Sequence, residues 1–344
     1  MKKSALAIFT TAAMATVLAS PSMADGDVNI YSYRQPFLIE PLLDTFTKET
    51  GIRANIIFAT QGLEARIKAE GENTPADLLL STDVGRLEAA KQDGIAQPVQ
   101  SDILNKNIPQ NFRDKDSQWF GLTTRARVVY ASNERVDLDS ITYEDLADPK
   151  WKGRLCTRSG QHDYSIGLFA SMIAHKGVEE TKIWLEGVKA NLAHRPNGND
   201  RSQVKSIYAG ECDLALGNTY YMGIMQTNQN EPEQQEWAKS VRILFPNTEG
   251  RGTHVNISGM LLTKHAPNKD NAIKLMEFLS SAEAQQMYAE GNYEYPVLGD
   301  VEPSEIVKSW GDFKPDPISL NEIADARKAA SELVDVVDFD AGAD

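Results

Sequence analysis

Two adjacent tyrosines, Tyr220 and Tyr221, are the residues whose type and position best suit metal chemistry. They follow an apolar run at residues 212–216 that predicts a short buried strand, and they precede a helical pattern that continues toward residue 229. Side chains at such a turn lie at the rim of an open α/β sheet, and the following helix N-terminus favours an anionic phenolate. Phenolate oxygen is a hard ligand that suits hard, highly charged cations such as Fe³⁺. Half-buried core packing is the alternative for an isolated tyrosine pair.

A third tyrosine is predicted at a comparable turn. Tyr164 lies in a polar turn at residues 159–165, between a predicted strand at residues 151–156 and a helical pattern. Ligands of open α/β sheets bind outside the carboxyl ends of the strands. We therefore expect Tyr164 to converge with Tyr220 and Tyr221 on one wall of a cleft.

The first strand of the mature chain offers one more position. Residues 28–31 predict a strand, and Tyr33 and Arg34 follow it directly. Tyr33 is either a further metal ligand or an ordinary tyrosine at the cleft rim, and the sequence leaves both interpretations open. Arg34 is the weaker of two arginine candidates for holding an anion beside the metal.

The stronger arginine candidate is Arg125. It lies in a long extended pattern at residues 119–132, rich in β-branched and aromatic residues, which we interpret as a strand that crosses between two lobes. Arg125 and Arg127 have the same parity, so a regular strand places them on one face. A guanidinium group matches the shape of a carboxylate or carbonate, which makes Arg125 a candidate anion clamp. An ordinary interface charge is the alternative.

The predicted elements alternate between strand and helix. Residues 28–93 follow the order β-α-β-α-β-α, which favours a mostly parallel sheet covered by helices. A second extended pattern at residues 254–263 predicts the return crossing, and a helix at residues 319–335 is expected among those that complete the first lobe and tie the lobes together. The predicted fold class is α/β, a two-lobed protein with two mixed sheets flanked by helices and joined by two crossing strands.

The same patterns give predicted domain boundaries. Residues 1–24 have the basic start, apolar stretch and small-residue end of a signal peptide, with cleavage after Ala24. The first lobe is expected to be discontinuous, comprising residues 25–124 and 260–344, and the second lobe to comprise residues 125–259, with the binding cleft between them. No later stretch approaches the roughly 20 apolar residues of a membrane span.

Composition fits a large exported protein. Hydrophobic residues make up 41% of the 344, enough for two domains with separate cores. The formal net charge is −14, and removal of Lys2 and Lys3 with the signal peptide makes it −16. A chain this acidic is a poor partner for nucleic acid.

The sequence contains only two cysteines, Cys156 and Cys212. In an oxidising compartment such a pair is expected to form a disulfide. A two-cysteine metal site is the weaker alternative, because no cysteine or histidine lies at ligand spacing beside either residue.

Four stretches carry a family resemblance. They are Tyr-Ser-Tyr-Arg at residues 31–34, Phe-Gly-Leu-Thr-Thr-Arg-Ala-Arg-Val at 120–128, Leu-Ala-Asp-Pro-Lys-Trp-Lys-Gly-Arg at 146–154 and Asn-Thr-Tyr-Tyr at 218–221. With them the chain resembles the ferric-ion-binding periplasmic proteins of ABC importers, the bacterial transferrin-like proteins, over essentially its whole mature length. The resemblance implies a type II periplasmic binding protein that is a monomer, closes on its cargo and docks to an inner-membrane ABC permease.

The resemblance also implies a ligand set. Fe³⁺ would be held by Tyr164, Tyr220 and Tyr221, with Arg125 binding a synergistic carbonate or bicarbonate. Relatives often supply a further ligand where this chain has Gln35 and Pro36 in place of a histidine and a tyrosine. That coordination position would fall to Tyr33, to water or to the anion.

Nothing in the sequence predicts an enzyme. The five histidines are scattered, and no Ser-His-Asp or paired-carboxylate arrangement can be placed. A receptor for a polyamine, thiamine or a phosphonate on the same fold is the second interpretation, in which aromatic rings would stack on the ligand. A secreted enzyme on a two-lobed scaffold is the third.

Overall fold

The computed structural model describes residues 26–343. The predicted signal peptide and its cleavage after Ala24 therefore lie outside the described residues. Among the helices that are described, none has the length and apolar content needed to cross a bilayer.

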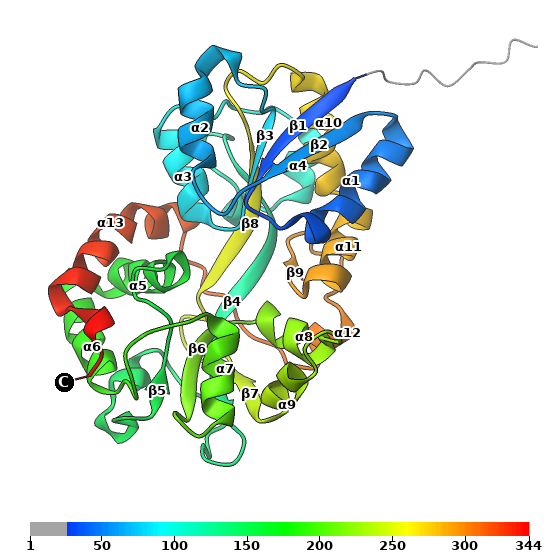
Figure 1. The fold of residues 1–344 in the computed structure, drawn as a ribbon. Helices are drawn as coiled ribbons and strands as arrows, with labels where there is room; N and C mark the ends of the chain where they lie inside the picture. The colour runs from blue at the N-terminus through cyan, green and yellow to red at the C-terminus, as the bar shows by residue number, and fades with distance from the viewer. Residues whose placement is uncertain (1–25, 344) are drawn as a thin grey trace, which may run out of the picture.

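The strands form one connected sheet that divides into two halves, one in each lobe (Figure 1). In the first lobe the order is β2-β1-β3-β8-β4, where β1, β2 and β3 are parallel and β8 runs antiparallel to both β3 and β4. In the second lobe β6 and β7 pair antiparallel with β4, and β5 runs parallel to β6. The strands are β1 Asp27–Ser32, β2 Arg53–Phe58, β3 Leu78–Ser81, β4 Phe120–Ser132, β5 Leu155–Cys156, β6 Leu214–Asn218, β7 Val241–Leu244, β8 Val255–Leu262 and β9 Tyr295–Pro296.

Strand β4 runs through both lobes. Its first half pairs with β8 and with the short β9, and its second half pairs with β6 and β7. The two extended patterns predicted to cross between the lobes correspond to β4 and β8. Within the described part of the chain, β8 pairs only with strand β3 of the first lobe and with the first half of β4, so β4 alone of the two pairs with strands of both lobes. All thirteen residues of β4 are buried, as expected for a strand covered on both faces.

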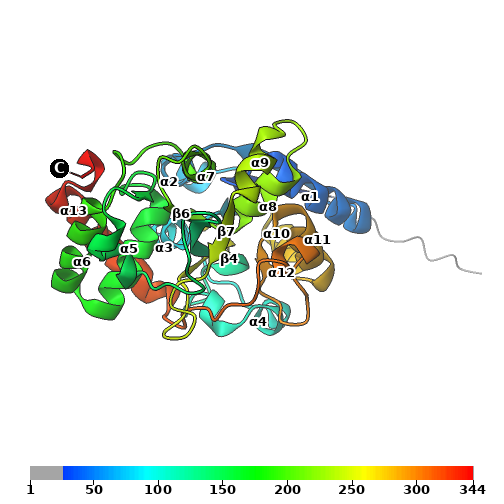
Figure 2. The same cartoon turned by 90° about the horizontal axis from the view of Figure 1, so that it is seen from below.

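Helices cover both halves of the sheet. The first lobe carries α1 Pro36–Thr50, α2 Leu63–Glu70, α3 Val84–Gln92, α4 Asp102–Asn107, α10 Lys269–Leu279 and α11 Ala282–Asn292. The second lobe carries α5 Asp163–Lys176, α6 Val178–Ala190, α7 Asp200–Tyr208, α8 Tyr220–Thr227 and α9 Glu233–Lys239, followed near the chain end by α12 Glu305–Lys308 and α13 Leu320–Val337. Figure 2 shows α5, α6 and α13 on one side of β6 and β7, with α8 and α9 on the other.

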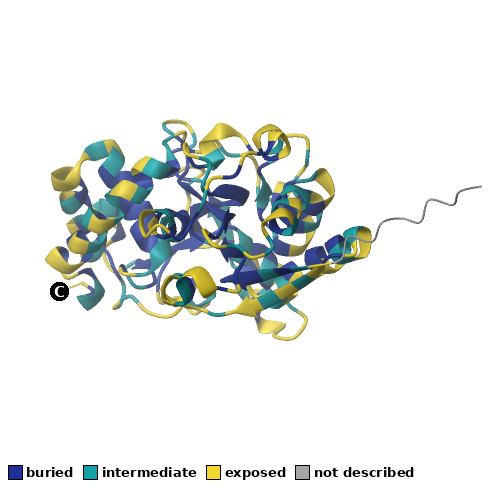
Figure 3. Ribbon diagram, turned by 90° about the horizontal axis from the view of Figure 1, so that it is seen from above, coloured by how far each residue is buried: buried dark blue, intermediate teal, exposed yellow. Residues whose placement is uncertain are grey.

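Side-chain caps set several helix starts that bear on the site. Asp83 accepts a hydrogen bond from the Gly85 N–H at the start of α3, and Asn199 forms a capping box with Ser202 at the start of α7. Exposed residues gather on the outer helix faces, and buried residues follow the central strands (Figure 3). These caps fix where α3 and α7 begin, and so fix the positions of the side chains in their first turns.

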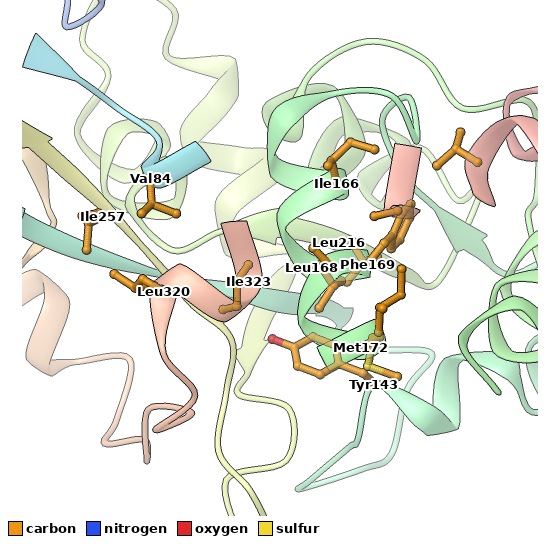
Figure 4. Packing of buried hydrophobic residues seen from close by; sticks show 14 of the residues in the cluster. Val84, Tyr143, Ile166, Leu168, Phe169, Met172, Leu216, Ile257, Leu320 and Ile323 are labelled. Atoms are coloured by element: carbon orange, nitrogen blue, oxygen red, sulfur yellow. The ribbon is translucent and has the colours of Figure 1, made fainter. Parts of the chain in front are cut away.

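The last helix corrects one prediction. We expected residues 319–335 to belong to the first lobe, but α13 packs chiefly along α5 and α6 of the second lobe and meets the first lobe through α3. Figure 4 shows Leu320 and Ile323 of α13 near Val84 of α3, with Leu168 of α5 in the same apolar cluster. An amphipathic helix buries its apolar stripe against a matching apolar surface. The periodicity of the sequence predicts the stripe but does not say which lobe provides that surface. Helix α12 likewise packs against α8 of the second lobe, so it too lies outside the lobe predicted for residues 260–344. The other lobe boundaries stay a prediction.

In the second lobe the predicted disulfide is confirmed, and one predicted strand is shorter than expected. Cys156 and Cys212 form a disulfide, with their Cα atoms 6.0 Å apart. The strand predicted at residues 151–156 comprises only Leu155–Cys156. It begins later in the sequence because Pro149–Trp151 form a 3₁₀ turn that is capped by Asp148.

Candidate metal centre

The tyrosine pair is held at a strand-to-helix turn, as predicted. Strand β6 ends at Asn218, and Tyr220 is the first residue of α8. The strand end is anchored on β4: the Thr219 N–H donates to the Ala126 carbonyl at 3.0 Å, and the Tyr130 hydroxyl donates to the Asn218 carbonyl at 2.5 Å. These contacts fix where the first turn of α8 begins, and with it the two phenol rings.

Tyr164 reaches the same place from α5. It is the second residue of that helix, whose first turn is capped by His162: the Tyr164 N–H donates to His162 Nδ1 at 3.2 Å. The hydroxyl oxygens of Tyr164 and Tyr220 lie 3.2 Å apart, and the rings of Tyr220 and Tyr221 have centroids 4.2 Å apart. The structure thus brings together all three tyrosines that the sequence predicted as ligands.

The three rings line a cavity between the lobes of about 240 Å³. Its first-lobe wall comes from the turn after β1 and the start of α1, and its second-lobe wall from the first turns of α5, α7 and α8. Three helix N-termini therefore point into one space. Their partial positive charge favours negative groups there.

Burial keeps the phenol protons in place before any ligand binds. Desolvation, followed by the neighbouring phenols, raises the pKa of Tyr220 well above its usual value of 10.0. Desolvation also raises the pKa of Tyr221, with Tyr164 and Asp200 adding to the effect. At neutral pH these hydroxyls are un-ionised, so a ligand that needs phenolates must displace the protons itself.

Tyr33 lines the cavity, but its hydroxyl is engaged elsewhere. It donates to Glu64 and accepts a hydrogen bond of 2.8 Å from the Leu63 N–H, both at the start of α2. The Arg86 guanidinium covers its ring at 4.2 Å from the centroid. Desolvation and the Glu64 hydrogen bond raise the pKa of Tyr33 to about 12. In this structure the Tyr33 oxygen serves as a structural link to α2.

The two arginine candidates differ in their partners. Arg34 is buried and forms an ion pair with Glu294 at 2.8 Å, so its charge is already balanced. Arg125 is 2% exposed and donates from Nη1 to the Ser258 hydroxyl at 3.0 Å. Its Nε and Nη2 atoms find no hydrogen-bond partner among residues 26–343. Both arginines line the cavity, but only Arg125 has unpaired buried donors facing an anion there, since the Arg34 guanidinium is paired with Glu294.

Two acidic residues at the site escaped sequence analysis as functional residues. Glu294 follows α11 and binds Arg34 and Thr123, the latter at 2.5 Å. Asp200 at the start of α7 binds Arg127 at 2.7 Å and Arg158 at 3.0 Å. No spacing signal in the sequence links either carboxylate to the tyrosines.

The donor set defines the chemistry available here. Within the described residues no group of three or more histidine, cysteine, aspartate or glutamate side chains could hold a metal ion. Among the described residues that line the cavity, the groups left for a ligand are three phenol oxygens and the unpaired donors of Arg125, because Glu294 and Arg34 pair with each other. Ionised phenols are hard, anionic oxygen ligands, which suit a hard cation of high charge better than a soft one.

The two-lobed α/β fold, with a phenol-lined cavity between the lobes, is that of a solute-binding protein. The chain belongs to the family of bacterial extracellular solute-binding proteins, whose sequence model matches residues 73–313.

Individual relatives agree with this assignment. The chain is 46% identical to iron uptake protein A1 of Synechocystis over 310 residues, which is 90% of this chain and 86% of that protein. It resembles the apo ferric ion-binding protein A of Pasteurella haemolytica with a TM-score of 0.86 and 53% identity, covering 91% of this chain and 98% of the other. A Trichodesmium protein solved in complex with iron and citrate gives a TM-score of 0.88 and 42% identity, covering 91% and 100%.

Proposed function

We propose that this protein is the periplasmic receptor of an iron importer and binds Fe³⁺ through the phenolate oxygens of Tyr164, Tyr220 and Tyr221. The observation that carries the proposal is the convergence of these hydroxyls, two of them 3.2 Å apart, in a cavity between lobes. The names of the relatives, an iron uptake protein and a ferric ion-binding protein, support the choice of cargo.

The proposed chemistry is an exchange of protons for the metal ion. Three phenolates carry a charge that balances Fe³⁺, so each ligand must lose its proton as the metal enters. The site releases protons on binding and loses affinity as the pH falls, because protons and metal compete for the same oxygens. Raised pKa values at Tyr220 and Tyr221 make that competition stronger.

A small anion would complete the site. We assign Arg125 to hold carbonate or bicarbonate, since two of its buried nitrogens lack a protein partner among the described residues. Arg34 is not assigned, because Glu294 balances it. The helix N-termini of α5, α7 and α8 add positive potential on the second-lobe wall.

The transport role follows from the family. A solute-binding protein that captures its cargo between two lobes delivers it to an ABC permease in the inner membrane, and we expect this chain to act as a monomer. The predicted signal peptide would direct it to the periplasm. A receptor role requires binding and release only, so no catalytic group is assigned.

The test is a visible absorption titration of the mature, chelator-stripped protein with a soluble ferric complex, with and without bicarbonate. Charge transfer from phenolate to Fe³⁺ should give an intense band that saturates at about one iron per protein. Dependence of the band on bicarbonate tests the role of Arg125. A protein that stays colourless at every iron concentration contradicts the proposal.

Single hydroxyl deletions sharpen the assignment. Tyr220→Phe should remove most of the ferric affinity, because it deletes one anionic ligand while keeping the ring. Tyr33→Phe is the matched control, since the Tyr33 oxygen bonds to Glu64 and Leu63 instead. Titration should show wild-type iron affinity in the control and a loss of at least about 100-fold in Tyr220→Phe. Equal losses in both variants would make Tyr33 a ligand after all.

A further inference from the structure

One buried carboxylate joins the segments that carry the three tyrosines. Asp200, the first residue of α7, is 0% exposed. Its Oδ1 accepts a hydrogen bond from Arg158 Nη1 at 3.0 Å, and its Oδ2 accepts one from Arg127 Nη1 at 2.7 Å. Oδ2 also accepts from the backbone N–H of Asn218 at 2.9 Å. Both carboxylate oxygens are therefore bonded, and three separate chain segments meet at this residue.

Two of these contacts lead directly to the tyrosines. Asn218 is the last residue of β6 and lies two positions before Tyr220, so its bond to Asp200 holds the strand end from which α8 starts. Arg158 places its guanidinium over the Tyr164 ring, 5.2 Å from the centroid. Asp200 thus restrains the tyrosine pair through the backbone and the third tyrosine through an arginine.

The charge arrangement makes Asp200 hard to replace. Arg127 and Arg158 are 2% and 8% exposed, and both rely on this one carboxylate for their ion pair. Without it two buried guanidinium groups would lack a counter-charge and would separate or draw in solvent. The N-terminal position of Asp200 on α7 further stabilises its negative charge.

We propose that Asp200 is the positioning residue of the tyrosine site: it sets the relative placement of Tyr164, Tyr220 and Tyr221 without contacting the cargo. This inference rests on the proposed ferric site. Asp200 also adds to the negative field at Tyr220 and Tyr221, behind burial and the neighbouring phenols. Removing its charge should therefore change the electronic energy of the phenolates as well as their geometry.

The second lobe supplies a matched control. Asp213 is likewise a largely buried aspartate, 9% exposed, that pairs with two arginines: its carboxylate binds Arg135 Nε and Arg154 Nε, each at 2.5 Å. It precedes β6 at the end opposite to the tyrosines. Asp213→Asn should thus remove the same kind of arginine-paired carboxylate from the same lobe while leaving the tyrosine site alone. Because Arg135 and Arg154 are more exposed than Arg127 and Arg158, its cost in stability should be smaller, and urea unfolding of both variants measures that difference.

The experiment compares Asp200→Asn with Asp213→Asn in the mature protein, titrated with a soluble ferric complex and bicarbonate. In Asp200→Asn we expect ferric affinity to fall about 10- to 100-fold. We also expect the charge-transfer band to move to shorter wavelength, since losing a nearby anion lowers the energy of the phenolate electrons. Asp213→Asn should keep the wild-type affinity and band. Wild-type affinity and band in Asp200→Asn, or the same change in both variants, would overturn the inference.

Two further variants guard against a folding defect. If Asp200→Asn fails to fold, Arg158→Gln decides, because it removes the Asp200-bound guanidinium over Tyr164 and leaves both Arg125 over that ring and the Asp200–Arg127 pair in place. An unshifted band in Arg158→Gln overturns the inference. Asp200→Glu, which keeps the charge, should recover part of the affinity.

A crystal structure of the iron-free variants supplies a readout that needs no metal. The hydroxyl separation of 3.2 Å between Tyr164 and Tyr220 should change in Asp200→Asn or Arg158→Gln and persist in Asp213→Asn. A colourless wild-type protein would instead sink the ferric proposal, and the structural comparison would still test Asp200.

Discussion

Removal of the Cys156–Cys212 disulfide should cost a large share of the protein's stability and little of its iron affinity. The bridge joins positions 56 residues apart, so in the chain-entropy model it is worth about 4 kcal/mol. Both cysteines are buried, at 0% and 2% exposure, which makes alanine the appropriate replacement because serine would bury two hydroxyls. The double variant Cys156→Ala/Cys212→Ala should therefore unfold at a much lower urea concentration than the oxidised parent.

Iron binding should survive because other contacts hold the same strands. Leu155 and Cys156 of β5 pair in parallel with Leu214 and Ala215 of β6, and this ladder does not depend on the bridge. Urea unfolding followed by circular dichroism measures the stability, and ferric titration of the folded variant measures the site. A decrease of less than about 1 kcal/mol in the free energy of unfolding would refute the loop-entropy estimate. A large loss of iron affinity in a folded variant would show that the bridge positions the tyrosines.

Two other substitutions test the packing of the second lobe and its response to pH. Gly160→Ala should destabilise the fold by about 1–3 kcal/mol in urea unfolding, because a Cβ there would lie 2.8 Å from the Phe339 ring beyond α13; Gly291→Ala, with open space around it, is the control. Burial alone would raise the pKa of Glu144, but hydrogen bonds that include one from Arg251 lower it to about 2. Its carboxylate thus stabilises the fold fully above pH 4.5 and loses that contribution as the pH falls toward 2. Glu144→Gln should lower the free energy of unfolding by about 1–2 kcal/mol at pH 7, a value already reduced because Glu144 is partly exposed. Urea unfolding at pH 3 should show a smaller loss. An equal loss of stability at both pH values would contradict this account.

Local patterns were enough to place the tyrosines. Tyr164, Tyr220 and Tyr221 each lie at a turn between an apolar strand and a helix, and short periodic segments of this kind are readable from a single sequence. The long crossing strand that carries Arg125 was predicted for the same reason, since β-branched and aromatic residues mark it along its length.

Contacts between distant segments were not readable. Arg34 looked free for an anion, but it pairs with Glu294, which lies 260 residues later in the chain. The sequence left Tyr33 open as a ligand or a rim tyrosine, and it did not show that the Tyr33 hydroxyl bonds to Glu64 of α2. Each of these contacts involves a polar partner set by the fold, and neither partner lies at a spacing that local periodicity reports. The same holds for Asp200, whose partners Arg127, Arg158 and Asn218 lie 18 or more residues away in the sequence.

The choice of phenols over carboxylates explains how such a site would discriminate among metals. Carboxylates are ionised at neutral pH, so a carboxylate cavity would attract calcium and magnesium, which prefer those oxygens. Tyr220 and Tyr221 instead stay neutral, because burial raises their pKa. The carboxylate that lines the cavity, Glu294, is paired with Arg34, so the cavity offers a divalent ion little attraction. Only a cation acidic enough to displace the phenol protons gains the anionic ligands. If three protons leave as the three positive charges of Fe³⁺ arrive, as proposed, the net charge of the buried site would be unchanged, and Arg125 would stay available for one accompanying anion.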